Sequence, residues 1–445
     1  MKESKKGKEK GSKTPKGTQD YTPEKEKKRQ SIIAECENIF LLYGAERIDT
    51  PTFELSSVLM EKYGDREKEK EIFNLENKGI SKGEDEGKEK CSLRYDLTVP
   101  FARYVKEKNI TKMKRYQIGK VFRRDQPGKH RLREFYQCDY DNLGNGEKWL
   151  MDAETLILLI SILRSLKEKY QLPNYLVKVN SRNNLTEIFK KSNISSDLFS
   201  TVCSSIDKLD KVSWDELVGE LEKKGLSETQ IISLKENLAL GVENETLSKT
   251  LNAVKSTLNI QEDTDGEKEI EVDYTLARGL DYYTDLIFEV VLTYKEVDES
   301  GQEKNKSISI AGGGRYDSLC KVPCVGFSLG IDRISPFCHI DYDYSKIYTV
   351  WITTNKCKDE KIRESLSLYK LKVTTLLRNR GINVGIESKV AVNNGEAVRS
   401  TADKKIPYII FLGEDELEKQ IVTVKTIATE DQIKVSLEEL KLLNF

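Results

Sequence analysis

The strongest constraint on the fold is a pair of strand-like segments joined by a short polar turn. Apolar and polar residues alternate over residues 113–124 and again over 132–141, and the sequence QPGKHR at 126–131 separates them. A connection this short joins antiparallel strands, because parallel strands need a long crossover. The sequence therefore predicts an antiparallel hairpin. Alternate residues from 133 to 141 would share one face, as would Arg123 and Asp125.

Further strand-like patterns indicate that the hairpin belongs to a larger antiparallel sheet. They occupy residues 272–277, 286–294, 307–310 and 325–329. Two distinctive sequences lie among them: RGLDYY at 278–283, expected as a loop, and AGGGRYD at 311–317, expected as a turn. Alternating charge alone usually marks the solvated face of a sheet. Its combination with the glycine-rich and arginine-containing sequences favours a phosphate-binding pocket.

Helical patterns before, within and after this sheet suggest the domain organisation. Apolar residues recur at helical spacing over 24–43 and 149–170, and several short charged helical patterns fill about 180–260. Strand and helix patterns alternate in the C-terminal segment, which is typical of an α/β unit. We predict a Lys-rich disordered tail (1–16), a catalytic domain (17–345) with a helical insertion at about 180–260, and a C-terminal α/β domain (346–445).

Composition excludes several classes of protein. Lys plus Arg number 73 and Asp plus Glu 74, so net charge neither favours nor excludes a nucleic-acid partner. The longest apolar run, residues 156–163, is too short to span a bilayer, and the N-terminus lacks the apolar core of a signal peptide. Together with eight scattered cysteines, this predicts a protein of the cytoplasm with free thiols and no membrane segment.

The sequence offers little support for metal chemistry or for a protein nucleophile. Cys320, Cys324, Cys338 and His339 lie close together, but without a C-x-x-C knuckle they are better explained by packing, and no metal site is predicted. Neither a P-loop nor a complete dinucleotide fingerprint is present. Because the chain has only two histidines, the chemistry is expected to depend on positioning and positive charge.

Six sequence segments resemble those of class II aminoacyl-tRNA synthetases, and specifically the eukaryotic cytosolic type of histidyl-tRNA synthetase. PKGTQDYTP and YGAERIDTPTFE resemble the family's N-terminal segment and motif 1, KVFRRDQPGKHRLREFYQCDYD resembles motif 2, and CVGFSLGIDR resembles motif 3. LARGLDYYT and AGGGRYD are similar to the two histidine-specific loops. The resemblance implies an α+β fold: an antiparallel sheet flanked by helices, a helical insertion that clasps the acceptor arm, and a C-terminal α/β anticodon-binding domain.

The resemblance also implies roles for individual residues. Histidine would be bound by Asp96, Leu97, Thr98, Gln137, Asp141, Tyr282, Tyr283 and Tyr316. ATP would be bound by Arg123, Asp125, Arg131, Phe135 and Arg333. Within these sets, Asp141 and Tyr283 would hydrogen-bond the imidazole and Phe135 would stack on adenine. Arg278 and Arg123 would be the catalytic residues, with Arg278 replacing a magnesium ion of other class II enzymes.

The implied activity is ATP-dependent ligation of L-histidine to tRNA(His) through a histidyl-adenylate, with release of AMP and pyrophosphate. ATP would act as a substrate with Mg²⁺, no permanently bound cofactor is expected, and motif 1 implies a homodimer. Three alternatives remain. They are a catalytically silent paralogue that regulates a histidine-pathway enzyme, a synthetase of another specificity, and a simple RNA-binding module. Arg123, Arg278, Arg333 and the C-terminal domain argue against the first.

Overall fold

A computed structural model describes residues 13–61, 71–76, 90–210, 212–260, 268–279, 282–297, 301–343, 346–355, 357–388 and 393–445. The packing of the chain divides it into two units, Met1–Ile340 and Asp341–Phe445. This division lies close to the boundary after residue 345 that the sequence suggests. Most of the predicted tail and Leu280 and Asp281 of the RGLDYY sequence lie outside the described residues.

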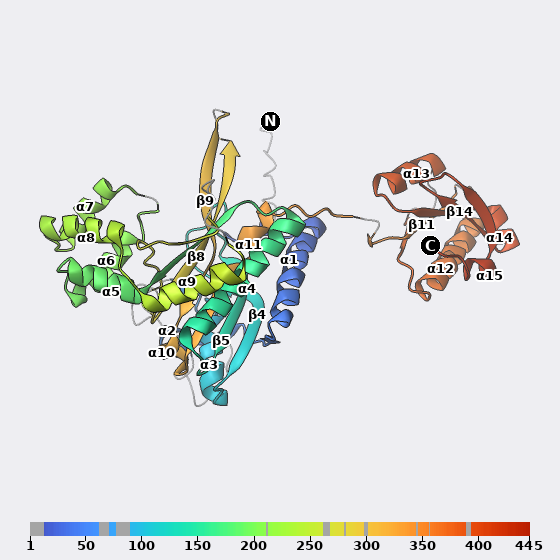
Figure 1. The fold of residues 1–445 in the computed structure, drawn as a ribbon. Coiled ribbons are helices and arrows are strands. Elements are labelled where there is room, and N and C mark those ends of the chain that lie inside the picture. Colours follow the sequence, from blue (N-terminus) through green and yellow to red (C-terminus); the bar gives the residue numbers. More distant parts are fainter. Residues whose placement is uncertain are drawn as a thin grey trace, which may run out of the picture. The chain divides into compact units, whose positions relative to one another are not determined.

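The first unit is built around an eight-stranded sheet with helices against it (Figure 1). Its strands, in spatial order, are β1 (Glu46–Arg47), β4 (Met113–Phe122), β5 (Glu134–Leu143), β10 (Cys324–Gly330), β9 (Glu303–Arg315), β8 (Leu286–Val297), β6 (Tyr175–Ser181) and β7 (Ile270–Val272). All neighbours pair antiparallel except the edge pairs β1–β4 and β6–β7. The predicted α+β class and central antiparallel sheet are confirmed.

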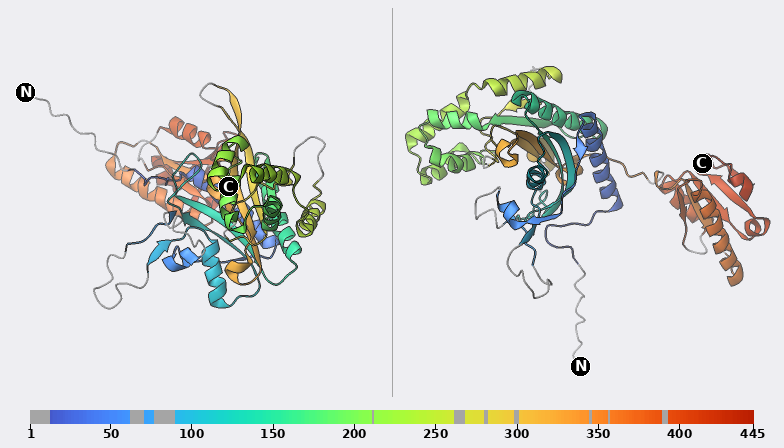
Figure 2. Two further views of the ribbon diagram at one scale, coloured as in Figure 1. Left: turned by 90° about the vertical axis from the view of Figure 1, so that its left-hand side faces the viewer. Right: turned by 90° about the horizontal axis from the view of Figure 1, so that it is seen from below.

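The main hydrophobic core lies where α1 (Pro23–Leu42) and α4 (Lys148–Tyr170) pack against each other and against the sheet (Figures 1 and 2). Phe40 of α1 stacks on Tyr140 of β5, with ring centroids 5.8 Å apart. Leu159 of α4 is fully buried in the same cluster. Each fully buried large apolar side chain stabilises the fold by roughly 1.5–3 kcal/mol. This core holds β5 and β10 in place from behind.

Shorter elements complete the first unit. They are β2 (Phe53–Leu55), α2 (Ser56–Glu61), β3 (Cys91–Leu93), α3 (Thr98–Lys108), α10 (Asp317–Cys320), α11 (Ile331–Ile334) and the 3-10 helix η3 (Ser335–Phe337). Strands β2 and β3 form a separate antiparallel pair.

The predicted helical insertion is occupied by helices; the last of them, Glu245–Thr257, packs against α4 in the main core, and the others share a core of their own. The helices are α5 (Arg182–Lys191), η2 (Ser196–Leu198), α6 (Phe199–Ile206), α7 (Trp214–Lys223), α8 (Glu228–Leu240) and α9 (Glu245–Thr257). Leu185, Val202, Leu221 and Leu234 are buried together in a second hydrophobic cluster. Capping boxes at Ser213 and at Ser227 begin α7 and α8, because each serine accepts an otherwise unpaired amide hydrogen.

Two of the predicted local structures are wrong. The segment predicted as a strand over 272–277 leaves the sheet after Val272, because the Asp273 carboxylate accepts hydrogen bonds from the Thr275 backbone and hydroxyl and closes a turn. The AGGGR residues predicted as a turn lie inside β9. A Cβ on Gly313 would lie closer than 3 Å to the Gly326 carbonyl oxygen and the Phe288 ring. Glycine is needed here for close packing of strands, not for a turn.

The second unit is a five-stranded mixed sheet with helices. Its elements are β11 (Val350–Thr354), α12 (Glu360–Arg378), β12 (Val384–Ile386), α13 (Asn394–Asp403), β13 (Tyr408–Leu412), α14 (Glu414–Lys419), β14 (Ile421–Thr426), β15 (Gln432–Ser436) and α15 (Leu437–Leu440). The spatial order is β12-β11-β13-β14-β15, with the first three strands parallel and the last two antiparallel to their neighbours. The C-terminal α/β pattern is therefore present, extended by one hairpin.

The predicted thiol packing can be located directly. Cys320 and Cys324 are buried in one small cluster with Phe101 and Tyr316, whereas Cys338 is buried in the main core. Among the residues that the structure describes, no three His, Cys, Asp or Glu side chains are grouped so that they could hold a metal ion. Within the same described ranges, no helix combines the length and hydrophobicity that a membrane crossing requires.

Candidate active site

A cavity of about 380 Å³ opens between the sheet and the segments that follow β3 and precede β8. Its floor is formed by residues of β5, β9 and β10, where Gly312, Gly313 and Gly326 leave the backbone uncovered. A Cβ on Gly326 would lie closer than 3 Å to the Asp141 carboxylate. The glycines therefore create the space that the polar side chains face.

Most of the site residues predicted from the sequence line this one cavity. They are Asp96, Thr98, Arg123, Phe135, Gln137, Asp141, Arg278, Tyr282, Tyr283, Tyr316 and Arg333. Asp125 and Arg131 line a smaller recess of about 110 Å³, which shares Arg123, Phe135 and Arg333 with the cavity. Leu97 differs, because its side chain is fully buried, and its carbonyl oxygen accepts hydrogen bonds from Arg115 and from the Phe101 amide, both at 3.3 Å.

Four guanidinium groups gather at one end of the cavity. Burial lowers the pKa of Arg333, and repulsion from the neighbouring guanidiniums of Arg123, Arg131 and Arg278 lowers it further. Arg333 donates to the Ser309 carbonyl oxygen at 2.9 Å. Positive charges that lie this close together repel one another unless a bound anion neutralises them. This end is therefore suited to a polyanion such as a chain of phosphates.

Aromatic rings lie beside the cationic end. The Arg123 guanidinium lies 4.3 Å from the Tyr95 ring centroid and 5.2 Å from that of Phe135, and its Nε donates to the Tyr95 carbonyl oxygen at 3.2 Å. A flat apolar ring next to a fixed guanidinium offers a stacking face for a nucleobase. Arg131 and Asp125 form an ion pair of 2.6 Å in the adjoining recess.

The opposite end of the cavity is built on a buried charge network. Arg115 of β4 is fully buried and lies 2.5 Å from the Asp141 carboxylate, which also accepts a hydrogen bond from the Tyr316 hydroxyl. Gln137 donates to the Ser328 hydroxyl at 2.7 Å. Its Oε1 is buried and has no hydrogen-bond partner among the described residues. An unsatisfied buried acceptor suits a ligand that carries an N–H group.

Arg278, one of these four guanidinium groups, is held in place by side chains of neighbouring segments. Its guanidinium pairs with Glu289 of β8 and lies 3.3 Å from the Ser309 hydroxyl and 3.8 Å from the Asp207 carboxylate. Burial raises the pKa of Glu289, and the positive charge of Arg278 opposes this rise. Because Glu289 is 5% exposed, it fixes the direction of a more exposed arginine.

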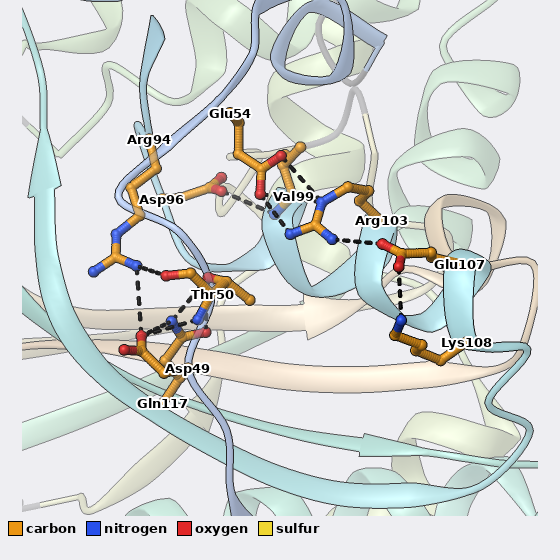
Figure 3. A network of polar contacts seen from close by, with 10 residues as sticks. All are labelled: Asp49, Thr50, Glu54, Arg94, Asp96, Val99, Arg103, Glu107, Lys108 and Gln117. Carbon is orange, nitrogen blue, oxygen red and sulfur yellow. Dashed lines mark hydrogen bonds and ion pairs between the residues drawn. The ribbon is translucent and has the colours of Figure 1, made fainter. Parts of the chain in front are cut away.

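The segment between β3 and α3 does not continue the strand. Figure 3 shows Arg94 directed to Asp49 and Thr50, away from Asp96. Asp96 instead accepts from the Val99 amide at 3.0 Å at the start of α3. This helix start turns Asp96 and Thr98 toward the cavity, because the helix N-terminus needs an acceptor.

Sequence patterns missed several residues that support the site. Arg115 could have been found from the hairpin register, which places it directly opposite Asp141. Glu289 and Ser309 lie on neighbouring strands far apart in the sequence, and no local signal relates either of them to Arg278. Asp139 is also buried beside Arg115, and burial raises its pKa to about 7.

Comparisons with known proteins agree with this geometry. Family models described as histidyl-tRNA synthetase and as anticodon binding domain match residues 17–334 and 349–442. A probable cytoplasmic histidine–tRNA ligase of Encephalitozoon cuniculi is 35% identical, over 96% of this chain and 97% of its own. A histidine–tRNA ligase of Danio rerio is 36% identical, over 96% and 87%.

The solved structures share the fold. The histidyl-tRNA synthetase of Nostoc sp. superposes with a TM-score of 0.68 at 24% identity, over 97% of this chain and 99% of that one. A Bacillus halodurans chain described as an ATP phosphoribosyltransferase regulatory subunit/histidyl-tRNA synthetase superposes with a TM-score of 0.62 at 17% identity, over 92% and 98%. On the family model and the identity to its full-length relatives, this chain belongs to the histidyl-tRNA synthetase family.

Proposed function

We propose that this chain is a histidine–tRNA ligase, which activates L-histidine with ATP and transfers it to the 3′ end of tRNA(His). The observation that carries the proposal is one cavity with three guanidiniums at one end, a fourth in the adjoining recess, and the Asp141–Arg115 network at the other end. Phosphates and an imidazole need these two environments side by side. The matching of relatives over nearly the full chain supports the same assignment.

In the first step, a histidine carboxylate oxygen attacks the α-phosphorus of ATP. A new bond forms between this oxygen and phosphorus while the bond to the β-phosphate oxygen breaks, which gives histidyl-adenylate and pyrophosphate. No protein nucleophile takes part. Arg123 and Arg278 would neutralise the charge that develops on the α-phosphate oxygens, and Arg131 and Arg333 would hold the leaving phosphates.

In the second step, the terminal ribose 3′-hydroxyl of tRNA attacks the adenylate carbonyl. The ester bond forms, the bond between the carbonyl carbon and the phosphate oxygen breaks, AMP leaves, and the hydroxyl proton passes to solvent. Asp96, Thr98 and Gln137 would bind the α-amino group, with Leu97 contributing through its backbone. Asp141 and Tyr283 would bind the two imidazole nitrogens, while Tyr282 and Tyr316 line the pocket. Each role is consistent with the donors and acceptors of that side chain.

ATP is proposed to enter with Mg²⁺ on its phosphates, and no permanently bound cofactor is proposed. Glu289 and Asp125 are carboxylates at the cationic end, and both pair with arginines. Magnesium usually keeps several waters and is held mainly by substrate phosphates. This donor set fits such a shared ion better than a cage of protein ligands.

The proposed partners follow the two-unit organisation. The second unit would bind the anticodon, and α5–α9 would contact the acceptor arm. A homodimer is proposed because β2 exposes Phe53, 54% of whose surface is accessible, beside an apolar groove of about 470 Å³ that includes Leu55, Val99 and Leu319. Action in the cytoplasm is proposed because relatives such as that of Dictyostelium discoideum are described as cytoplasmic.

Exchange of labelled pyrophosphate into ATP tests the proposal on the purified chain. Each amino acid is supplied in turn, and only histidine is expected to support exchange. Exchange with another amino acid would indicate a synthetase of different specificity, and no exchange at all would favour a silent paralogue. The fold alone cannot separate these cases, because it is shared with the Bacillus halodurans chain.

A further inference from the structure

An aromatic ring of the turn between β4 and β5 packs against two aromatic rings of the rest of the unit. His130 lies against Tyr294 of β8, with ring centroids 6.2 Å apart and planes at 80°, and against Phe337 of η3, at 5.5 Å and 37°. The rings of Tyr294 and Phe337 are themselves 4.8 Å apart. We call these three residues the turn anchor. Tyr294 and Phe337 also pack against the main core, so the anchor joins a surface turn to a rigid part of the fold.

An ion pair reinforces the same attachment. Lys129 pairs with Glu296 of β8, and Glu296 also pairs with Lys306 of β9. These lysines are more than half exposed, and exposed ion pairs contribute little because water screens them. The rings of the turn anchor are therefore the larger part of the attachment.

The anchored turn carries a residue of the cationic end. Gly128 and Arg131 exchange two backbone hydrogen bonds, of 2.9 and 3.2 Å, so the four residues 128–131 form one closed unit. Arg131 directly follows His130 and lines the smaller recess. Arg123 and Arg333 line both this recess and the main cavity. Because the turn is closed in this way, a displacement of its backbone at His130 would also displace the backbone of Arg131.

We propose that His130 is a positioning residue for ATP, whose ring holds the turn so that Arg131 meets the distal phosphates. The inference rests on the proposed adenylation reaction and deepens it. His130 acts through Arg131 and takes no part in bond making. The anchor would lower the entropic cost of ordering the turn when ATP binds, because the turn is already held in place.

The electrostatic surroundings of His130 favour its neutral form. Its Nε2 is buried and has no hydrogen-bond partner among the described residues. Partial burial lowers the pKa of His130, the positive charges of Lys129 and Arg333 lower it further, and Glu296 opposes them. Because the docked state has the lower pKa, docking is complete above the ordinary histidine pKa and weakens as the pH falls.

Pyrophosphate exchange with the full chain tests the inference, with ATP and histidine varied separately. His130→Ala is expected to raise KM for ATP by about tenfold, the upper range for one aromatic contact, with KM for histidine within about twofold of wild type. His130→Phe keeps a ring and should restore the ATP KM. In the wild type, the KM for ATP should rise as the pH falls from about 7.5 to about 5.5, and His130→Phe should remove this rise. His339→Ala is the matched control, because His339 is the second of two histidines and is exposed.

A double-mutant cycle with Arg131→Ala distinguishes positioning from a general structural role. If His130 acts through Arg131, the effect of His130→Ala on the ATP KM should largely disappear in the Arg131→Ala background. The inference is wrong if the two effects add, or if His130→Ala changes tRNA charging and leaves exchange unaltered. Absence of histidine-dependent exchange in the wild type would instead refute the proposed function. His130→Phe keeps the test valid if His130→Ala does not fold.

Discussion

Replacing Arg115 by methionine is expected to destabilise the first unit and the histidine end of the cavity together. The Arg115 side chain is fully buried and that of Asp141 is 4% exposed, with 2.5 Å between guanidinium and carboxylate. Methionine has a similar length but leaves the Asp141 carboxylate without a cation. Removing one partner of a buried ion pair costs about 3–5 kcal/mol. We expect about 3 kcal/mol, because the Tyr316 hydroxyl still donates to Asp141.

Calorimetry and a double-mutant cycle measure this cost. Calorimetry is suitable because the chain packs as two units, and calorimetry reports each unfolding transition that occurs. Asp141→Asn alone leaves Arg115 unpaired and should also destabilise the unit. The double substitution Arg115→Met with Asp141→Asn removes both charges and should cost clearly less than the sum. Arg47→Met is the control, because its pair with Glu37 is 62% exposed on the arginine side, and it should cost less than about 1 kcal/mol.

The same variants connect stability to binding. Histidine affinity should fall by tenfold or more in Arg115→Met, since an uncompensated Asp141 is protonated more readily and loses strength as an acceptor. Isothermal titration with histidine measures this loss. Additive stability changes in the cycle, or a neutral Arg115→Met, would refute the view that this pair organises the cavity.

Three further substitutions test separate parts of the site. Arg278→Ala should lower kcat for adenylate formation by at least ~10²-fold with little change in histidine KM; rapid-quench rates near wild type would contradict this role. Gly313→Ala should lower the free energy of unfolding by about 1–3 kcal/mol, because the added methyl group forces β9 from its neighbours. Gly219 of α7 faces open space, so Gly219→Ala should stabilise the fold slightly. Burial raises the pKa of Asp139 to about 7, so its ionisation opposes folding and the wild type should lose stability as the pH rises toward and through about 7. Asp139→Asn should remove this loss. Urea midpoints at several pH values measure it, and parallel profiles for both proteins would count against it.

The sequence predicted those elements that are determined by residues close together in the chain. The hairpin follows from alternation and a Pro-Gly turn, and β4 and β5 pair antiparallel as predicted. The helix over Pro23–Leu42 follows from apolar spacing, with a proline in its first turn. The α/β alternation of the C-terminal unit was visible for the same reason. Each of these segments carries its own signal within about twenty residues.

Interactions between distant segments explain what the sequence did not reveal. The glycines of β9 resemble a turn locally, but their function depends on Phe288 and Gly326 from neighbouring strands. Glu289 supports Arg278 only because β8 and β9 bring it beneath the cavity. The roles of individual site residues stay predictions, since they came from resemblance and geometry places most of these residues at one cavity without assigning their contacts.

Charging of tRNA(His) with labelled histidine tests the central claim most directly. Purified chain, ATP, Mg²⁺ and a tRNA(His) transcript should yield histidine esterified to the terminal ribose, released by mild base and absent when periodate has destroyed the 3′ end. Omission of ATP should abolish the product. The account predicts charging by histidine alone. Failure to charge under conditions where histidine binds, or equal charging by another amino acid, would contradict it.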